Sequence, residues 1–143
     1  METNEKQFVT VKAIINAPVE KVWKYWTEPE HITKWNNASP DWHSPSAQND
    51  LRKGGQFLIR MEAKDGSMGF DFGGTYDDVI QNKKISYIMD DGRVVSIDFS
   101  SHGNSTTVTE TFEAEQENPI ELQKNGWQGI MDNFKRYVEE NPS

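Results

Sequence analysis

The sequence contains no cysteine among its 143 residues. A chain without thiols forms no disulfide, offers no thiolate nucleophile and cannot build a zinc–thiolate site. It also contains no apolar run long enough to cross a membrane, and its amino end does not have the pattern of a signal peptide. We therefore expect a cytoplasmic protein that does not insert into membranes.

Basic residues are scarce: 15 Lys and Arg stand against 23 Asp and Glu, which gives a net charge of −8. This balance argues against binding to a nucleic-acid backbone. No basic residue lies between Arg93 and Lys124. Such an acidic stretch is either a solvated face or a docking surface for a basic partner. Its acidic residues are Asp98, Glu110, Glu113, Glu115, Glu117 and Glu121.

No catalytic or metal-binding motif is evident. The three histidines, His31, His43 and His102, are too far apart in the sequence to show ligand spacing. No serine lies in a nucleophile-elbow context, and the Gly54–Gly55 pair lacks a phosphate-loop pattern. We expect no metal, no cofactor and no recognisable catalytic residues.

Aromatic residues, by contrast, are plentiful, with seven Phe, five Trp and four Tyr. Each of them can bury about 150–250 Å², so the core is expected to be aromatic-rich. A chain of this length is most simply one domain, here residues 1–143.

The last long segment, residues 118–139, predicts an amphipathic helix. Asn118 and Pro119 are typical of a helix start, and Trp127, Met131 and Phe134 recur along one stripe. Gln123 and Lys124 interrupt the apolar arc near its amino end. Either this end frays with its glycine pair tolerated, or it borders a space that protein does not fill.

Ahead of this helix the pattern is mostly that of strands. Residues 8–16 predict a strand, and two short helices follow, the second starting from a capping box of Thr27 and Glu30. Residues 36–50 show no periodicity and predict a long loop holding Trp42 and His43, either a mobile lid or an Ω-loop. Five strands joined by tight turns then predict an antiparallel meander.

The predicted class is α+β, with about six or seven antiparallel strands facing the long helix. Period-two alternation assigns side chains to the inner face. By the same parity, and with a bulge at Gly73–Gly74, the inner residues are Phe57, Ile59, Met61, Phe70, Phe72, Tyr76, Ile85, Tyr87, Met89, Val95, Ile97, Phe99, Val108 and Phe112. Glu110 falls on the same face. A buried carboxylate must find a partner, reach water in a cavity or take up a proton.

Several short motifs, spread over nearly the whole chain, resemble those of START-like (SRPBCC) domains. The closest resemblance is to the homologues of the activator of the 90-kDa heat-shock-protein ATPase. The matching stretches are 17–23 (APVEKVW), 27–32 (TEPEHI), 34–35 (KW), 50–52 (DLR), 54–55 (GG) with Phe57, 74–76 (GTY) and 126–127 (GW).

This resemblance implies a helix-grip fold, in which a curved antiparallel sheet wraps around the long carboxy-terminal helix and two short helices close one end. It also implies a deep cavity for lipids, polyketide-like aromatics or other hydrophobic molecules. The family name by itself does not carry a chaperone function. Glu110 departs from the apolar residue commonly expected in such a strand.

The main functional hypothesis is non-enzymatic binding of a hydrophobic or aromatic small molecule between the sheet and the final helix, by a monomer or weak homodimer. One alternative is a cyclase or dehydratase using Glu110 and Tyr76. Another is a chaperone-type interaction module that docks through the acidic stretch and stimulates a heat-shock-protein ATPase. The predicted cavity residues are Trp35, Trp42, His43, Phe57, Met61, Phe70, Phe72, Tyr76, Tyr87, Met89, Phe99, Glu110, Gln123, Trp127 and Met131.

Overall fold

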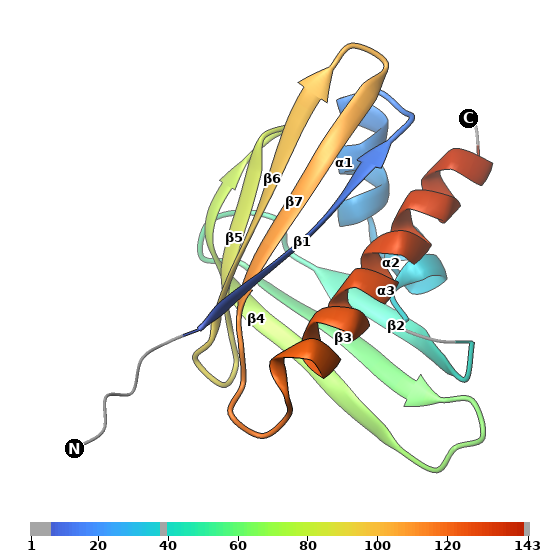
Figure 1. Ribbon diagram of the computed structural model, residues 1–143, viewed down its shortest axis with the longest axis vertical. Coiled ribbons are helices and arrows are strands. Elements are labelled where there is room, and N and C mark those ends of the chain that lie inside the picture. The colour runs from blue at the N-terminus through green and yellow to red at the C-terminus, as the bar shows by residue number, and fades with distance from the viewer. Residues whose placement is uncertain (1–6, 38–39, 142–143) are drawn as a thin grey trace.

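The computed structural model describes residues 7–37 and 40–141. Within these residues the chain forms seven strands and three helices (Figure 1). In chain order they are β1 (Phe8–Ile15), α1 (Val19–Thr27), α2 (Pro29–Trp35), β2 (Trp42–Asn49), β3 (Gln56–Ala63), β4 (Gly69–Ile80), β5 (Lys84–Met89), β6 (Val94–His102), β7 (Ser105–Glu113) and α3 (Ile120–Glu140).

The strands pair antiparallel in the order β1-β7-β6-β5-β4-β3-β2. The sheet curls, α3 lies across its concave side, and α1 and α2 lie at one end (Figure 1). The α+β helix-grip architecture expected from the sequence is therefore confirmed.

Side-chain alternation fixes what each strand presents to α3. In β7, every second residue from Thr106 to Phe112 is buried. The register aligns Glu110 with Val11 of β1 and with Ile97 of β6, both of which are buried. Glu110 therefore sits in an inward-facing row, flanked by two apolar side chains.

Several of the tight turns between strands contain a residue with positive φ. Gly92, between β5 and β6, has φ of 95°, and Asn82, between β4 and β5, has φ of 63°. Both values lie in the left-handed region, which glycine and asparagine tolerate better than other residues. These turns set the strand pairing on which the inner face depends.

The prediction of a loop over residues 36–50 is wrong for most of its length. Residues Trp42–Asn49 form the edge strand β2, which pairs with β3. The register shifts between His43 and Ser46, around Pro45. Proline is tolerated on edge strands and at bulges, and an edge strand with a bulge shows no clean alternation in its sequence. Neither a mobile lid nor an Ω-loop therefore spans Trp42–Asn49, and residues 38–39 lie outside the described part.

Three smaller predictions are also corrected. Thr27 does not cap α2; its Oγ1 donates to the carbonyl oxygen of Trp23 at 2.8 Å, and Glu28 occupies the N-cap. The N-cap of α3 is Pro119, one residue later than predicted. The expected bulge at Gly73–Gly74 is absent because the β4 irregularity lies between Tyr76 and Asp78.

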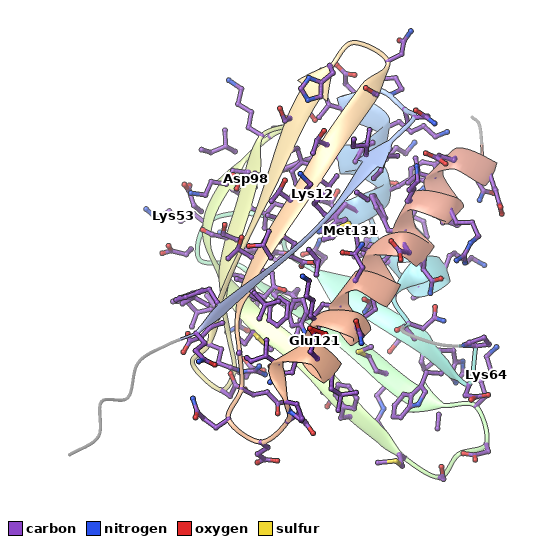
Figure 2. All side chains as sticks on the ribbon, viewed as in Figure 1. Lys12, Lys53, Lys64, Asp98, Glu121 and Met131 are labelled. Carbon is purple, nitrogen blue, oxygen red and sulfur yellow. The ribbon has the colours of Figure 1, made fainter. Side chains whose placement is uncertain are left out.

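The carboxy-terminal half of α3 packs tightly. Met131, Phe134 and Val138 are 0% exposed, and Figure 2 shows Met131 between α3 and the sheet. The rings of Trp26 and Trp35 both meet Phe134 edge-on at centroid distances of 4.8 Å. The amino-terminal half is different, since residues 126–130 of α3 are only half-buried.

We predict that Phe134→Ala lowers the free energy of unfolding by about 3–5 kcal/mol, because it opens a cavity among Trp26, Trp35 and the sheet. Leu122→Ala, at an exposed position of the same helix, is the control and should change it by less than about 0.5 kcal/mol. Urea denaturation measures both. Equal effects of the two changes would show that α3 is not anchored through Phe134.

Candidate functional site: a cavity under the amino-terminal half of α3

A cavity of about 300 Å³ lies between the sheet and the amino-terminal half of α3. Residues of both short helices, of strands β2 to β5 and β7, and of α3 line it, together with three residues that lie between elements. They are Trp26, Ile32, Trp35, Asn36, Asn49, Phe57, Ile59, Met61, Phe70, Phe72, Tyr76, Ile85, Tyr87, Met89, Arg93, Glu110, Glu115, Gln123, Trp127 and Ile130.

Eleven of the predicted site residues line this cavity. They are Trp35, Phe57, Met61, Phe70, Phe72, Tyr76, Tyr87, Met89, Glu110, Gln123 and Trp127. Most were identified by strand parity, which places alternate residues of β3, β4 and β5 on the concave face. Their role in ligand binding remains a prediction.

Four predicted residues do not line the cavity. Trp42 packs against Phe70 at a centroid distance of 5.9 Å. The Nε2 of His43 lies 3.8 Å from a carboxylate oxygen of the partly exposed Glu62. Phe99 packs against Trp23 at 5.1 Å in the core, and Met131 is fully enclosed. Trp42 and His43 were misplaced because β2 was taken for a loop, and the other two because an inner face contains core as well as cavity.

The cavity also contains residues that were not predicted to line it. Ile59 and Ile85 alternate with predicted cavity residues of β3 and β5, so strand parity in the sequence could have identified them. Trp26, Ile32 and Ile130 lie on helices whose apolar faces point inward. No periodicity could have identified the remaining four, which lie at element ends or in turns: Asn36, Asn49, Arg93 and Glu115.

Aromatic rings make up much of the wall. Trp127 of α3 stacks on Phe112 of β7, with centroids 3.9 Å apart and planes within 10°. The ring of Phe57 in β3 meets the ring of Tyr87 edge-on, with centroids 4.8 Å apart. It also packs at a tilt against the ring of Tyr76, with centroids 5.3 Å apart. Such rings give a rigid apolar surface, and their faces carry partial negative charge.

Glu110 is the polar group that departs most from this apolar setting. Its side chain is 7% exposed, and no group of residues 7–37 or 40–141 forms a hydrogen bond or ion pair with its carboxyl. Burial raises the pKa of Glu110 to about 8, because a charged carboxylate is poorly solvated there. At neutral pH the carboxyl of the free protein is therefore mostly protonated.

The two cavity tyrosines differ in their hydrogen bonding. The hydroxyl of Tyr76 donates to Oδ1 of Asn49 at 2.6 Å, and burial raises the pKa of Tyr76. Tyr87 is also buried. Its pKa is raised mainly by this burial and secondly by the nearby Glu110. Glu110 therefore contributes to the raised pKa of Tyr87 and not to that of Tyr76, the tyrosine named in the cyclase or dehydratase hypothesis.

Gln123 closes a loop, and its amide nitrogen is not free for a ligand. Its Oε1 accepts from the backbone N–H of Glu115 at 2.9 Å, and its Nε2 donates to the carbonyl oxygen of Asn118 at 2.7 Å and of Glu115 at 3.3 Å. These bonds tie the β7–α3 connection to the first turn of α3. Lys124, by contrast, is exposed and does not line the cavity.

Asn36 contributes a second polar group with an unused hydrogen-bonding capacity. Its side chain is 7% exposed and lines the cavity. Its Nδ2 has no acceptor among the described residues. The cavity thus combines apolar walls with two side chains, Glu110 and Asn36, whose polar atoms the described part of the protein leaves unpaired.

The described residues also lack two other kinds of feature. They contain no group of three or more His, Cys, Asp or Glu side chains placed to hold a metal ion. None of their helices combines the length and apolar character needed to span a membrane.

A curved antiparallel sheet gripping a carboxy-terminal helix over an internal cavity defines a START-like domain. Residues 16–139 match the family described as activator of Hsp90 ATPase homolog 1-like protein, and the chain belongs to this family. No curated protein matches the chain.

Solved structures agree with this assignment. An AHSA1-like protein of Aeromonas hydrophila is 47% identical, with a TM-score of 0.88 over 94% of this chain and 93% of its own. A protein of Cytophaga hutchinsonii is 55% identical, with a TM-score of 0.81 over 93% and 92%. A Nitrosomonas europaea protein, 21% identical with a TM-score of 0.79 over 93% and 94%, shares the fold. This fold supports a ligand-binding domain in general terms.

We predict that Glu110→Gln changes how stability depends on pH. The folded-state pKa of Glu110 is about 8 against 4.5 for the ordinary group, so the folded chain retains a proton that the unfolded chain loses. Below about pH 4.5, Glu110 is protonated in both states, and its contribution to the free energy of unfolding is fully present. Between about pH 4.5 and 8 this contribution falls by roughly 1.4 kcal/mol per pH unit.

The measurement is urea denaturation at several pH values between 4.5 and 9. The variant should gain stability over the wild type as pH rises, whereas Glu121→Gln, at an exposed position of α3, should follow the wild type. Parallel curves for the wild type and Glu110→Gln would show that Glu110 ionises normally.

Proposed function

We propose that this protein binds a hydrophobic or aromatic small molecule in the cavity beneath α3 and does not transform it. The observation that carries this proposal is an aromatic-walled space of about 300 Å³ that the core leaves unfilled. Spaces of this size and lining, with a few polar groups, are typical of small-molecule sites. The proposal treats the chain as one cytoplasmic domain, acting as a monomer or weak homodimer.

The lining favours a ligand with a flat or extended apolar body. Trp127, Phe72 and Tyr87 present ring surfaces from three different elements. Phe70 lines the cavity while remaining 49% exposed, so it lies near the opening. Trp42 packs against Phe70 from outside and supports this rim without touching the cavity.

A catalytic role is the second candidate, and one observation favours it. The pKa of Glu110, about 8, suits a general acid near neutral pH. Tyr76, the other residue of the cyclase or dehydratase hypothesis, already donates its hydroxyl to Asn49. Under this alternative, Glu110→Gln would abolish turnover and spare ligand affinity; under our proposal, no turnover exists to abolish.

A chaperone-type partner follows from the family name alone. The acidic stretch does not form one surface, because Glu110 is buried and Glu115 lines the cavity. Absence of salt-sensitive binding to a heat-shock-protein ATPase, or of any stimulation of its hydrolysis, would remove this hypothesis.

We predict that at least one compound from a panel of fatty acids, sterols and flavonoid-like molecules raises the melting temperature. A ligand present at about 100 times its Kd should raise it by roughly 5–10 °C for a chain of this size. Differential scanning fluorimetry and intrinsic Trp fluorescence measure the effect.

A matched pair of variants locates the binding. Ile130→Trp introduces a bulky ring at the cavity wall and should abolish the shift. Ile88→Trp makes the same change at a position that is 44% exposed and does not line the cavity, and should preserve it. Loss of the shift in both variants, or in neither, would contradict binding in this cavity.

A further inference from the structure

We propose that the cavity selects ligands carrying a protonated amine, with the carboxylate of Glu110 as the counter-ion and the surrounding aromatic rings as cation-binding faces. This inference rests on the proposed binding function and assigns its ligand class. It follows from the groups that surround Glu110.

Among the described residues, Glu110 has no cationic partner. Arg93 is the basic residue that lines the cavity, and its Nε donates to Oδ2 of Asp91 at 2.8 Å. Its other contact is a 3.5 Å bond from Nη1 to the carbonyl oxygen of Glu113. Arg93 therefore lines the cavity with its Nε already paired to Asp91, and it forms no ion pair with Glu110, whose carboxyl is left for a ligand.

The remaining charged and titratable groups favour a cation over an anion. Glu115 is a second carboxylate in the lining, and its Oε1 accepts from Asn118 at the loop before α3. Tyr76 and Tyr87 are neutral phenols whose pKa values are raised. An anionic ligand such as a fatty acid would meet two carboxyl groups and one arginine already bound by Asp91.

Aromatic rings supply the second part of the recognition. Phe112, two residues along β7, stacks with Trp127, and Tyr87 lies close enough for Glu110 to raise its pKa. A cation is attracted to the face of Trp or Tyr, and more strongly in a desolvated site. Charge-assisted hydrogen bonds to a carboxylate are also stronger than neutral ones.

Proton balance gives the inference a distinctive signature. An amine enters as an ammonium ion, while Glu110 of the free protein carries a proton below about pH 8. Formation of the ion pair therefore releases one proton from the Glu110 carboxyl to the buffer, and the N–H groups of the ligand then donate to the carboxylate. Amine affinity should rise as pH increases from 6 to 8, whereas a neutral ligand should release no proton.

The test compares matched ligands by isothermal titration calorimetry at pH 6.5 in two buffers of different ionisation enthalpy. The pairs are octylamine with octan-1-ol and 2-phenylethylamine with 2-phenylethanol. In the wild type we expect each amine to bind at least about tenfold more tightly than its alcohol, with release of about one proton. Glu110→Gln should abolish both the preference and the proton release, and Glu121→Gln should keep both.

Three results would overturn the inference. Equal affinity of amine and alcohol in the wild type would point to a neutral-ligand site and leave the proposed function intact. An amine preference that persists in Glu110→Gln would remove Glu110 from recognition. If no amine binds while the wider panel also gives no response sensitive to Ile130→Trp, the binding function itself fails.

Discussion

The packing of α3 on the sheet is uneven, and the rest of the structure depends on this. Its carboxy-terminal half is anchored by Phe134 between Trp26 and Trp35, with Met131 and Val138 fully enclosed. Its amino-terminal half stands over a sheet too curved for one helix to cover. The β7–α3 loop, tied by Gln123, fixes where the helix begins. The space that remains is the cavity, and six elements contribute aromatic rings to its wall: α1, α2, α3, β3, β4 and β5.

The placement of Glu110 follows from this packing. An apolar residue at the same inward position of β7 would avoid the desolvation of a carboxyl group. Instead, Glu110 is buried and has no partner among the described residues. This arrangement lowers the stability of the fold at pH values above 4.5, the ordinary pKa of a glutamate. Buried polar groups that oppose folding concentrate at functional sites, because a ligand can supply the missing partner. Asn36, whose Nδ2 has no acceptor among the described residues, lies on the α2 side of the cavity.

Much of the architecture could be predicted from the sequence because its signals are local. The tight turns between strands predicted the meander, and parity assigned Phe57, Tyr87 and Glu110 to the concave face. Strand β2 was missed because an edge strand with a proline and a bulge has no regular alternation. That error placed Trp42 and His43 in a long loop, whereas both lie in β2. Parity also could not separate core from cavity, since Phe99 and Met131 face inward but pack against protein.

The central claim is that the helix leaves a space in which Glu110 has no partner among the described residues. Carbon-13 NMR of side-chain-labelled glutamate, with Glu110→Gln to assign the resonance, follows the ionisation of this carboxyl in the folded, ligand-free protein. The structure predicts a midpoint near pH 8, well above the ordinary value of 4.5. A midpoint near 4.5 would mean that the carboxyl is solvated or paired, and would contradict the account of the cavity and of the ligand class proposed for it.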